Sequence, residues 1–407
     1  MALPNRAGSG LTLFFLMISS VAWAQGLGQV SGRVVSATTR QPIAGALVGL
    51  PAKGLATLTN AEGFFTYKYP NVSQQETLTI TAPGYRDLTK KAVEAIKDTL
   101  FLLDSAKQVV LDSSKLMIHS ARKLVENALL KVRDNYPSSV FTMNGFYRET
   151  LTRDGATARL SEAVLKVEHN PGHAAEELMP EKVKILKARK YENPALTVDL
   201  ESFSFGNGAA LVTHSMEMGI PEYLDGKNLD DYRFRLDSAL GSYSNRALWQ
   251  IHFSPSSKRV KAAREGTIWL DTLTLAFVKI DYEFTPEGRE DVLKSTMKSV
   301  FGNVFGGSRT TVQRVHGYYA YRLFNGKWYL NDSGLELAAD FQKKETKTNA
   351  AIRLHFVSTE IFPRVNVPLR ENEAMQSTNN FPKGGRYDDG FWAQYNFVKA
   401  TAGERMK

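Results

Sequence analysis

Apolar and polar residues alternate along short segments between residues 28 and 103. In Gly28–Ser36 and Thr77–Ala82 every second residue is apolar or small, which is typical of strands with one buried face. Turn-forming residues at Thr38–Gly45 and Asn60–Gly63 separate these segments. Turns at intervals of roughly 8–12 residues predict a β-sandwich or barrel, so we expect a small sandwich over residues 25–106.

A different period follows the sandwich. Ile118, Ala121, Val125, Ala128 and Val132 recur at intervals of three and four residues, which is typical of a helix with one apolar stripe. Residues 112–114 (Asp-Ser-Ser) offer N-caps, and the proline at position 137 would end the pattern. We therefore expect an amphipathic helix over residues 114–135, within a linker over residues 107–137.

Amphipathic strands dominate the chain beyond residue 138. The clearest pattern is a hairpin over Gly266–Phe284, with a turn at Asp271–Thr274. We expect a curved antiparallel sheet, built like a half-barrel, over residues 138–365, and an extended tail over residues 366–407 that packs on this domain. The fold class is therefore mainly β. The other expected strands are Phe141–Thr152, Ala158–Glu168, Lys182–Tyr191, Tyr232–Leu236, Leu248–Ser254, Thr310–His316, Tyr318–Phe324, Lys327–Asp332 and Ala351–Glu360.

The first 24 residues have the three parts of a secretory signal peptide. Arg6 is the only cation, Leu11–Val21 is apolar, and Ala22 and Ala24 are the small residues expected before a cleavage site. A membrane span needs about 18 or more apolar residues, and neither this segment nor any later one has them. We expect an exported protein with no transmembrane span after cleavage, located in the periplasm or at the outer membrane.

Composition narrows the chemistry. The 407 residues include no cysteine, which excludes thiol catalysis, cysteine zinc sites, disulfides and the lipid attachment of a lipoprotein. The formal net charge is +9. In an exported protein this charge favours anionic lipids or acidic glycans over nucleic acid, which we do not expect as a partner. The basic cluster at Lys182, Lys184, Lys187, Arg189 and Lys190 alternates with apolar residues and is interpreted as a solvated sheet face.

Four motifs of the N-terminal segment carry a resemblance to a known family. They are V-x-G-x-V at Val30–Val34, T-R-Q-P-I-A-G-A-L-V at Thr39–Val48, T-N-A-E-G-F-F at Thr59–Phe65, and A-P-G-Y at Ala82–Tyr85. In this order they resemble the carboxypeptidase regulatory-like domain. The resemblance implies a seven-stranded, transthyretin-like sandwich that packs or docks and has no catalytic site.

Two further resemblances concern the rest of the chain. The hairpin over Gly266–Phe284 looks like those of LolA-type lipoprotein carriers, which are half-barrels. The order of signal peptide, sandwich and helix, followed by the G-F-Y-R-E motif at Gly145–Glu149 and the D-x-x-F-W-x-x-Y-N motif at Asp389–Asn396, is similar to exported carboxypeptidase-like regulatory domain proteins of Bacteroidetes. These resemblances imply an envelope location more than an activity.

A zinc peptidase is the first enzyme to test. His173 and Glu176 have the H-x-x-E spacing of zinc ligands, and His316 or His355 could be a third ligand. The motif lies in a loop with proline and glycine between predicted strands, and no partner motif is recognisable. We expect no metal and no cofactor.

No other catalytic motif stands out. The chain has no G-x-S-x-G and no P-loop. The adjacent acids Asp230–Asp231 and Asp388–Asp389 would point to opposite faces of a strand, so neither pair could flank one bond. We predict no catalytic residues.

We therefore interpret the chain as a non-catalytic exported protein with a binding or scaffolding role. Aromatic side chains of the C-terminal sheet would either form its core or line a concave face that binds a lipid acyl chain or a glycan; a lipid carrier would need an apolar cavity. The alternatives are an envelope hydrolase and an accessory docking protein for outer-membrane transporters. The candidate ligand-binding residues are Phe146, Tyr147, Trp249, Phe253, Trp269, Phe277, Tyr282 and Trp328, with Phe356 as a further aromatic of the same face.

Overall fold

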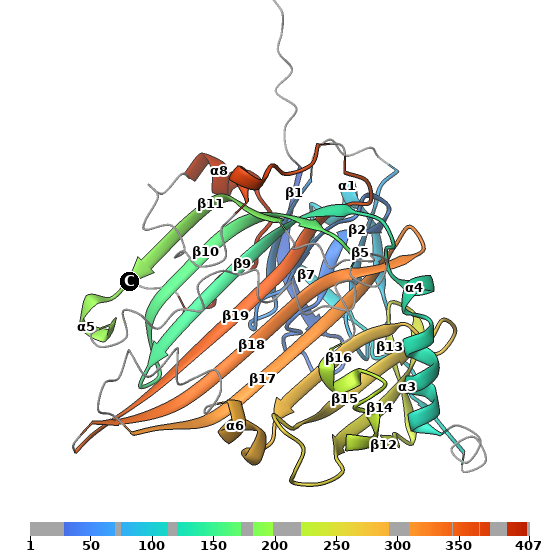
Figure 1. Ribbon diagram of the computed structural model, residues 1–407. Helices are drawn as coiled ribbons and strands as arrows, with labels where there is room; N and C mark the ends of the chain where they lie inside the picture. Colours follow the sequence, from blue (N-terminus) through green and yellow to red (C-terminus); the bar gives the residue numbers. More distant parts are fainter. Residues whose placement is uncertain are drawn as a thin grey trace, which may run out of the picture.

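The computed structural model describes residues 28–69, 75–112, 120–171, 182–197, 221–292, 309–343, 345–365, 367–374 and 389–404. The segment interpreted as a signal peptide lies outside these residues. The described part is mainly β and consists of a small sandwich and a large antiparallel sheet (Figure 1). The expected mainly β fold class is therefore confirmed, and so is the expected combination of a small sandwich and a large antiparallel sheet.

Seven strands form the N-terminal sandwich. One sheet has the order β4-β1-β7, in which β1 and β7 are parallel, and the other has the order β6-β5-β2-β3. The alternation seen in the sequence directs Val30 and Val34 inward, where they pack with Phe65, Tyr67 and Ile80 between the sheets. The strands are β1 (Gly28–Ser36), β2 (Leu47–Leu50), β3 (Leu55–Leu58), β4 (Phe64–Tyr69), β5 (Thr77–Thr81), β6 (Leu88–Lys91) and β7 (Leu100–Leu103).

Two glycines make the tight turns of this sandwich possible. Gly45 has φ of 67° and Gly63 has φ of 80°, in the left-handed region that side chains disfavour. The backbone N–H of Gly63 donates to the carbonyl of Asn60 at 2.9 Å, and the Asn60 side-chain Oδ1 accepts from the N–H of Phe64 at 2.9 Å. The N-A-E-G motif of the sequence is thus a closed turn that leads into β4.

The large sheet runs in the order β11-β10-β9-β19-β18-β17-β16-β15-β14, and β12 and β13 both pair with β14. All pairings within it are antiparallel. Its strands are β9 (Phe141–Arg153), β10 (Ala156–His169), β11 (Lys182–Glu192), β12 (Tyr232–Leu236), β13 (Ala239–Tyr243), β14 (Arg246–Pro255), β15 (Arg264–Asp271), β16 (Phe277–Phe284), β17 (Arg309–Phe324), β18 (Lys327–Lys343) and β19 (Thr346–Phe362).

The predicted hairpin at Gly266–Phe284 is present as β15 and β16. Asp271 closes its turn, because Oδ1 accepts from the backbone N–H of Leu273 at 3.1 Å and from that of Thr274 at 2.7 Å. Two expectations about neighbouring strands were wrong. The segments expected on either side of Gly317 form the single strand β17, and the strand expected at Lys327–Asp332 continues to Lys343 as β18.

The expected amphipathic helix is interrupted in the structure. Ser120, with an extended backbone, is the N-cap of α3 (Ala121–Leu130), and Lys131, with φ of −96° and ψ of 2°, separates α3 from α4 (Val132–Asn135). The expectation of one continuous helix over residues 114–135 was therefore wrong, whereas its predicted start at residue 114 lies outside the described residues. The stripe itself is correct, because Ala121, Val125 and Ala128 are buried against the sheet.

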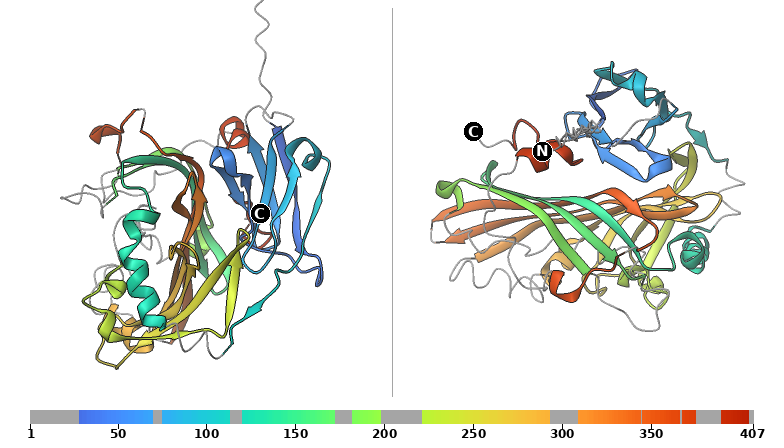
Figure 2. Two further views of the ribbon diagram at one scale, coloured as in Figure 1. Left: turned by 90° about the vertical axis from the view of Figure 1, so that its right-hand side faces the viewer. Right: turned by 90° about the horizontal axis from the view of Figure 1, so that it is seen from above.

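The sheet therefore has two differently covered faces (Figure 2). We call the face on which α3 packs the inner face, and the face toward the sandwich the outer face. The other short elements are η1 (Pro51–Lys53), α1 (Ala92–Ala95), β8 (Val109–Val110), α5 (Pro194–Thr197), η3 (Glu222–Leu224), η4 (Leu229–Asp231), α6 (Pro286–Val292), η6 (Glu371–Glu373) and α8 (Asp389–Gln394).

Backbone hydrogen bonds join the sandwich to the large sheet. Strand β8, which follows the sandwich, pairs with β13, and Leu55 of β3 forms a bridge with Glu360 of β19. The N–H of Gly84 donates to the carbonyl of Ser242 at 2.9 Å. The two bodies are therefore connected at three places along the outer face.

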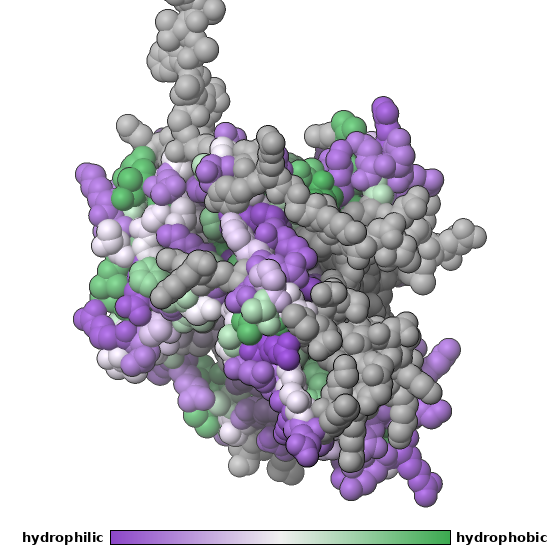
Figure 3. Space-filling model, turned by 90° about the vertical axis from the view of Figure 1, so that its left-hand side faces the viewer, coloured by the Kyte–Doolittle hydropathy of each residue, from purple (hydrophilic) through white to green (hydrophobic). Residues whose placement is uncertain are grey.

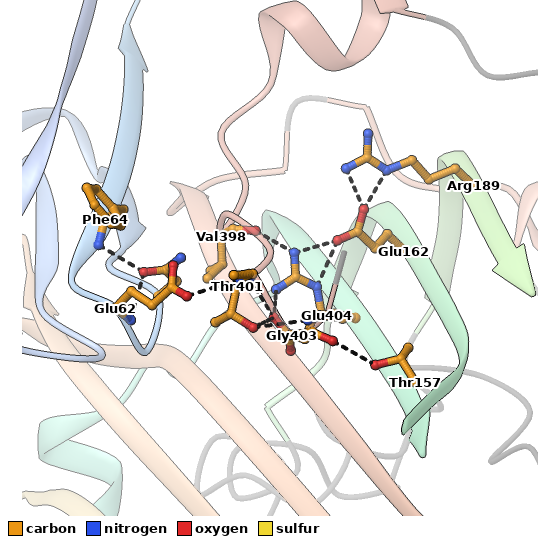
Figure 4. A network of polar contacts seen from close by, with 12 residues as sticks. Glu62, Phe64, Thr157, Glu162, Arg189, Val398, Thr401, Gly403 and Glu404 are labelled. Carbon is orange, nitrogen blue, oxygen red and sulfur yellow. Dashed lines mark hydrogen bonds and ion pairs between the residues drawn. The ribbon is translucent and has the colours of Figure 1, made fainter. Parts of the chain in front are cut away.

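The C-terminal segment lies between the same two bodies. Trp392 and Val398 pack with Leu58 of the sandwich and with Phe146 and Val164 of the sheet. Figure 4 shows the polar contacts beside this cluster: Arg189 binds Glu162 on one side, and on the other side Arg148 donates both to Glu162 at 2.8 Å and to the carbonyl of Val398 in the tail at 2.6 Å. The tail therefore packs against both the sandwich and the outer face of the sheet, and it joins the two.

The exposed surface of the described residues is mainly polar. In the view of Figure 3, hydrophobic residues are scattered among hydrophilic ones and do not form one broad patch. Within the described ranges, no helix has the length and apolar character needed to cross a bilayer.

Candidate functional site

A cleft of about 620 Å³ lies between the sandwich and the outer face of the large sheet. On the sandwich side its wall consists of small turn residues, among them Gly45 and Gly84, and of Lys107 and Gln108 from the linker. Its sheet wall comes from strands β13 to β18 and carries the larger side chains. Neither body forms this cleft alone, so it exists only because the sandwich docks on the sheet.

Two aromatic rings and one cation form the centre of the sheet wall. The ammonium Nζ of Lys279 lies 5.1 Å from the centre of the Trp269 ring and 5.4 Å from that of the Tyr318 ring. The Trp269 indole is held in place because its Nε1 donates to Oε1 of Gln250 at 3.0 Å. These side chains come from four adjacent strands, β14 to β17, and alternation places them all on the outer face.

Amide and carboxylate groups form the next part of the same wall. Nδ2 of Asn331 donates to Oδ1 of Asp332 at 2.8 Å, while Oδ1 of Asn331 is buried and has no hydrogen-bond partner. Burial, together with the negative charge of Asp332, raises the pKa of the Tyr318 hydroxyl well above its usual value. Tyr318 is therefore neutral and its O–H is hydrogen-bonded to Asp332, while Asn331 offers an acceptor that no described residue satisfies.

Of the predicted ligand-binding aromatics, only Trp269 lines this cleft. Phe253, Phe277, Tyr282 and Trp328 belong to the core that the inner face shares with α3, as do Tyr147 and Phe356, and Trp249 packs against that core. Phe146 lies on the outer face, in the cluster with Trp392 at a ring distance of 6.4 Å. The expected set is thus divided between the two faces, because adjacent residues such as Phe146 and Tyr147 must point to opposite sides of a strand.

The candidate metal ligands do not form a site in the described residues. His173 and Glu176 lie outside these residues. Nε2 of His316 is bound to Oδ1 of Asp281 at 2.8 Å, and Nε2 of His355 lies 3.9 Å from Oδ2 of Asp332. No group of three metal-ligating side chains occurs in the parts of the chain that the structure describes.

The predicted acidic pairs and basic cluster have structural partners. Asp230 lies in η4 and binds Arg122 at 2.7 Å, whereas Asp388 lies outside the described residues. On β11, Lys184 pairs with Glu373 at 2.7 Å, and Lys190 pairs with Glu192 at 2.7 Å. Arg189 of the same strand binds Glu162. Much of the positive charge of β11 is therefore neutralised locally.

Sequence reasoning missed most of the cleft. Gln250, Lys279, Tyr318 and Asp332 are polar positions of amphipathic strands, and the sequence offers no signal that separates them from a solvated face. The alternation in Phe277–Phe284 does place Lys279 and Asp281 together on the polar side of β16. Nothing local shows that two sandwich turns cover this side.

Comparisons with known proteins concern the two parts of the chain separately. Solved structures with some similarity to the chain include the following two. One is a domain from Vibrio parahaemolyticus described as belonging to an outer membrane lipoprotein-sorting protein, with 11% identity, 62% of this chain and 97% of that chain covered, and a TM-score of 0.26. The other is a DUF1329 family protein from Desulfovibrio piger, with 8% identity, 58% and 91% covered, and a TM-score of 0.23. Both TM-scores are too low to support a statement about function.

For the sequence itself, no curated protein matches the chain. The motifs of the N-terminal segment are matched by one family model, the CarboxypepD_reg-like domain, over residues 30–112. This range contains all seven strands of the sandwich except the first two residues of β1. The resemblance that its four motifs carry is therefore confirmed: residues 30–112 match the CarboxypepD_reg-like domain.

Proposed function

We propose that this protein is a non-catalytic, exported binding protein of the cell envelope, and that its ligand is a glycan held in the cleft between the sandwich and the sheet. The export part of the proposal rests on the signal-like sequence of the first 24 residues. The binding part rests on the cleft and on the chemistry of its sheet wall.

One observation carries the choice of a glycan. An indole and a phenol, a cation, and amide and carboxylate groups gather on one wall of a cleft of about 620 Å³, a volume within the range of ligand sites. Sugars present C–H faces that pack on aromatic rings and hydroxyl groups that both donate and accept hydrogen bonds. The unsatisfied Oδ1 of Asn331 would accept from such a hydroxyl, and so would the hydroxyl oxygen of Tyr318, whose own proton is hydrogen-bonded to Asp332.

An acyl chain fits this wall less well. Burying an alkyl chain against Asn331, Asp332 and Lys279 would remove water from polar groups without replacing their hydrogen bonds. The aromatic residues of the inner face, which were the basis for a lipid ligand, are occupied by packing against α3 and against each other. The argument for a bound ligand therefore rests on the cleft at the outer face and not on the aromatic residues of the inner face.

The test uses two tryptophans on neighbouring strands. Trp269 lines the cleft, whereas Trp249 is also half-buried but lies on the inner face. The full mature chain is titrated with soluble oligosaccharides from envelope polysaccharides and followed by tryptophan fluorescence and calorimetry. We expect saturable binding that Trp269→Ala weakens by about tenfold or more and that Trp249→Ala leaves unchanged.

Native mass spectrometry of the purified protein tests the rival proposal, in which the ligand is an acyl lipid. A co-purified acyl lipid, together with no binding of any oligosaccharide, would contradict the proposal. Equal effects of the two tryptophan substitutions would also contradict it, because they would show that the cleft is not the site.

A further inference from the structure

A second, smaller cavity of about 230 Å³ lies at the same boundary. It is separate in its chemistry from the cleft, although Tyr243 borders both. The sandwich contributes Gly54, Thr79, Thr81 and Asp87 to its wall, and the sheet contributes Tyr243 and Arg322. The cavity therefore has one ionisable side chain of each sign, and each comes from a different body.

Arg322 is a buried cation without a carboxylate partner. Its side chain is 7% exposed, and both hydrogen bonds of its guanidinium use Nη2, to the Gly54 carbonyl at 3.0 Å and to Oγ of Ser358 at 3.4 Å. In the described part of the chain its Nε is buried and has no hydrogen-bond partner, and Arg322 forms no ion pair with a carboxylate. Burial lowers the pKa of Arg322 to about 10, so the group is still charged at neutral pH.

A buried guanidinium is normally paired, because desolvating a charge costs several kcal/mol that only an opposite charge and hydrogen bonds can offset. The Gly54 carbonyl and the Ser358 hydroxyl are neutral acceptors. They bind only Nη2 of Arg322 and do not offset its charge. An anionic group that enters the cavity would supply both the charge and an acceptor for the free donors.

Asp87 is a carboxylate that lacks a cationic partner among the described residues. It lies between β5 and β6, its Oδ1 is buried, and this oxygen has no hydrogen-bond partner. Burial raises the pKa of Asp87, and a hydrogen bond from Thr81 opposes this rise. A positively charged group in the cavity would compensate this half-buried carboxylate in the way that an anion would compensate Arg322.

We propose that this cavity binds a small zwitterionic molecule of about the size of a free amino acid, with its anionic group on Arg322 and its cationic group on Asp87. A simple anion would leave Asp87 uncompensated and would be repelled by it. A simple cation would leave Arg322 uncompensated and would be repelled by it. Only a ligand with both charges satisfies the buried Arg322 and the half-buried Asp87 together.

The size and position of the cavity define the ligand further. At about 230 Å³ it is smaller than the sites of drug-sized ligands, so it excludes the oligosaccharides proposed for the cleft. Because Arg322 belongs to the sheet and Asp87 to the sandwich, one ligand would bridge the two bodies. Binding would therefore stabilise the docking of the sandwich.

The experiment uses amino acids whose charges are increasingly far apart. Glycine, β-alanine and γ-aminobutyrate are titrated into the full mature chain by calorimetry, with acetate and methylammonium as single-charge probes. We expect at least one amino acid to bind and to raise the melting temperature, and both single-charge probes to bind at least about tenfold more weakly.

Two substitutions and a control locate the binding. Asp87→Asn and Arg322→Gln should each weaken the amino acid by about tenfold or more, whereas Asp104→Asn, at an exposed aspartate of the same sandwich outside the cavity, should not. Circular dichroism shows whether each variant is folded, and Asp87→Asn alone tests the proposal if Arg322→Gln is not.

Three results would overturn it. They are no heat or melting shift with any amino acid at millimolar concentrations, acetate binding as tightly as the best amino acid, and binding that Asp87→Asn does not change. The oligosaccharide titration is independent of these results, because it depends on Trp269 and not on Arg322 or Asp87.

Discussion

Asn396 binds the backbone of Lys68 with both ends of its side-chain amide. Its Oδ1 accepts from the N–H of Lys68 at 2.7 Å, and its Nδ2 donates to the carbonyl of the same residue at 2.7 Å. Lys68 lies on β4, an edge strand of the sandwich, so one side chain replaces the two hydrogen bonds that a further strand would make. In addition, Nζ of Lys68 donates to the carbonyls of Trp392 at 2.9 Å and of Tyr395 at 3.1 Å. The tail is therefore attached to the sandwich by specific polar contacts as well as by packing.

Removing the Asn396 amide should loosen this attachment. Asn396→Ala leaves a buried N–H and a buried carbonyl of Lys68 without partners, and we expect a loss of about 2–3 kcal/mol in the free energy of unfolding. Asn396→Asp keeps the acceptor and should cost less. Urea denaturation followed by circular dichroism measures both; two variants as stable as the wild type would show that the tail does not hold the sandwich in solution.

Glu162 should be far more important for stability than an exposed glutamate with the same kind of partners. It accepts from Nε of Arg148 at 2.8 Å and also binds Arg189, and it is 1% exposed (Figure 4). Glu162→Gln leaves two guanidinium groups without their carboxylate, and we expect a loss of about 3–5 kcal/mol. Glu126, between Arg122 and Lys123 on the exposed side of α3, provides the matched control. Glu126→Gln should change the stability little, and equal effects in chemical denaturation would contradict the prediction.

The two turn glycines of the sandwich should differ in their sensitivity to alanine. A Cβ on Gly63 would lie 2.5 Å from the carbonyl oxygen of Val34, whereas a Cβ on Gly45 would meet nothing within 4 Å. Both have positive φ, so each alanine carries a backbone cost of about 1–2 kcal/mol. Gly63→Ala has the steric clash in addition and should lower the melting temperature more than Gly45→Ala does. The reverse order in thermal denaturation would show that the turn adapts.

Asp281 should make the free energy of unfolding depend on pH in the acidic range. Burial raises the pKa of its carboxyl group, but the hydrogen bond from His316 and the charge of Lys279 outweigh this and lower the pKa to about 2. Because the pKa in the folded protein lies below that of the unfolded chain, the stabilisation is complete above about pH 4 and is lost as the pH falls toward 2. Asp281→Asn should therefore be less stable than the wild type by about 1–2 kcal/mol near neutral pH, after an allowance for partial exposure.

Urea denaturation at a series of pH values tests this dependence. The difference in unfolding free energy between the wild type and Asp281→Asn should shrink as the pH falls from about 5 to about 2. A difference that stays constant over this range would mean that Asp281 has the same pKa in the folded and the unfolded chain.

The strand pattern of the sequence was informative where each strand has one buried face. The hairpin of β15 and β16 has apolar residues at every second position and a turn that Asp271 closes locally, so a short segment holds all the information it needs. Strand β13 (Ala239–Tyr243) has a weak pattern of its own and was not predicted. It forms because β14 pairs with it on one side and β8 on the other.

The breaks in the helix and the placement of the aromatics show the limits of the same reasoning. A periodic stripe does not say where a helix is interrupted, and here Ser120 caps the start of α3 and Lys131 separates α3 from α4. Phe146 and Tyr147 were expected on one concave face. Strand geometry alone separates adjacent residues, and only the packing of α3 and the tail shows which face each of them covers.

The mainly β fold, the sandwich and its family resemblance could be read from the chain alone, because alternation and turn glycines act over a few residues. Which polar residues form a site depends instead on how the two folded bodies pack together. Trp269 and Gly84 line one cleft, and Arg322 and Asp87 line one cavity, although more than a hundred residues separate each pair along the chain. Such neighbours are chosen by the docking of one folded body on another, and a period of two along a strand carries no information about what will cover it.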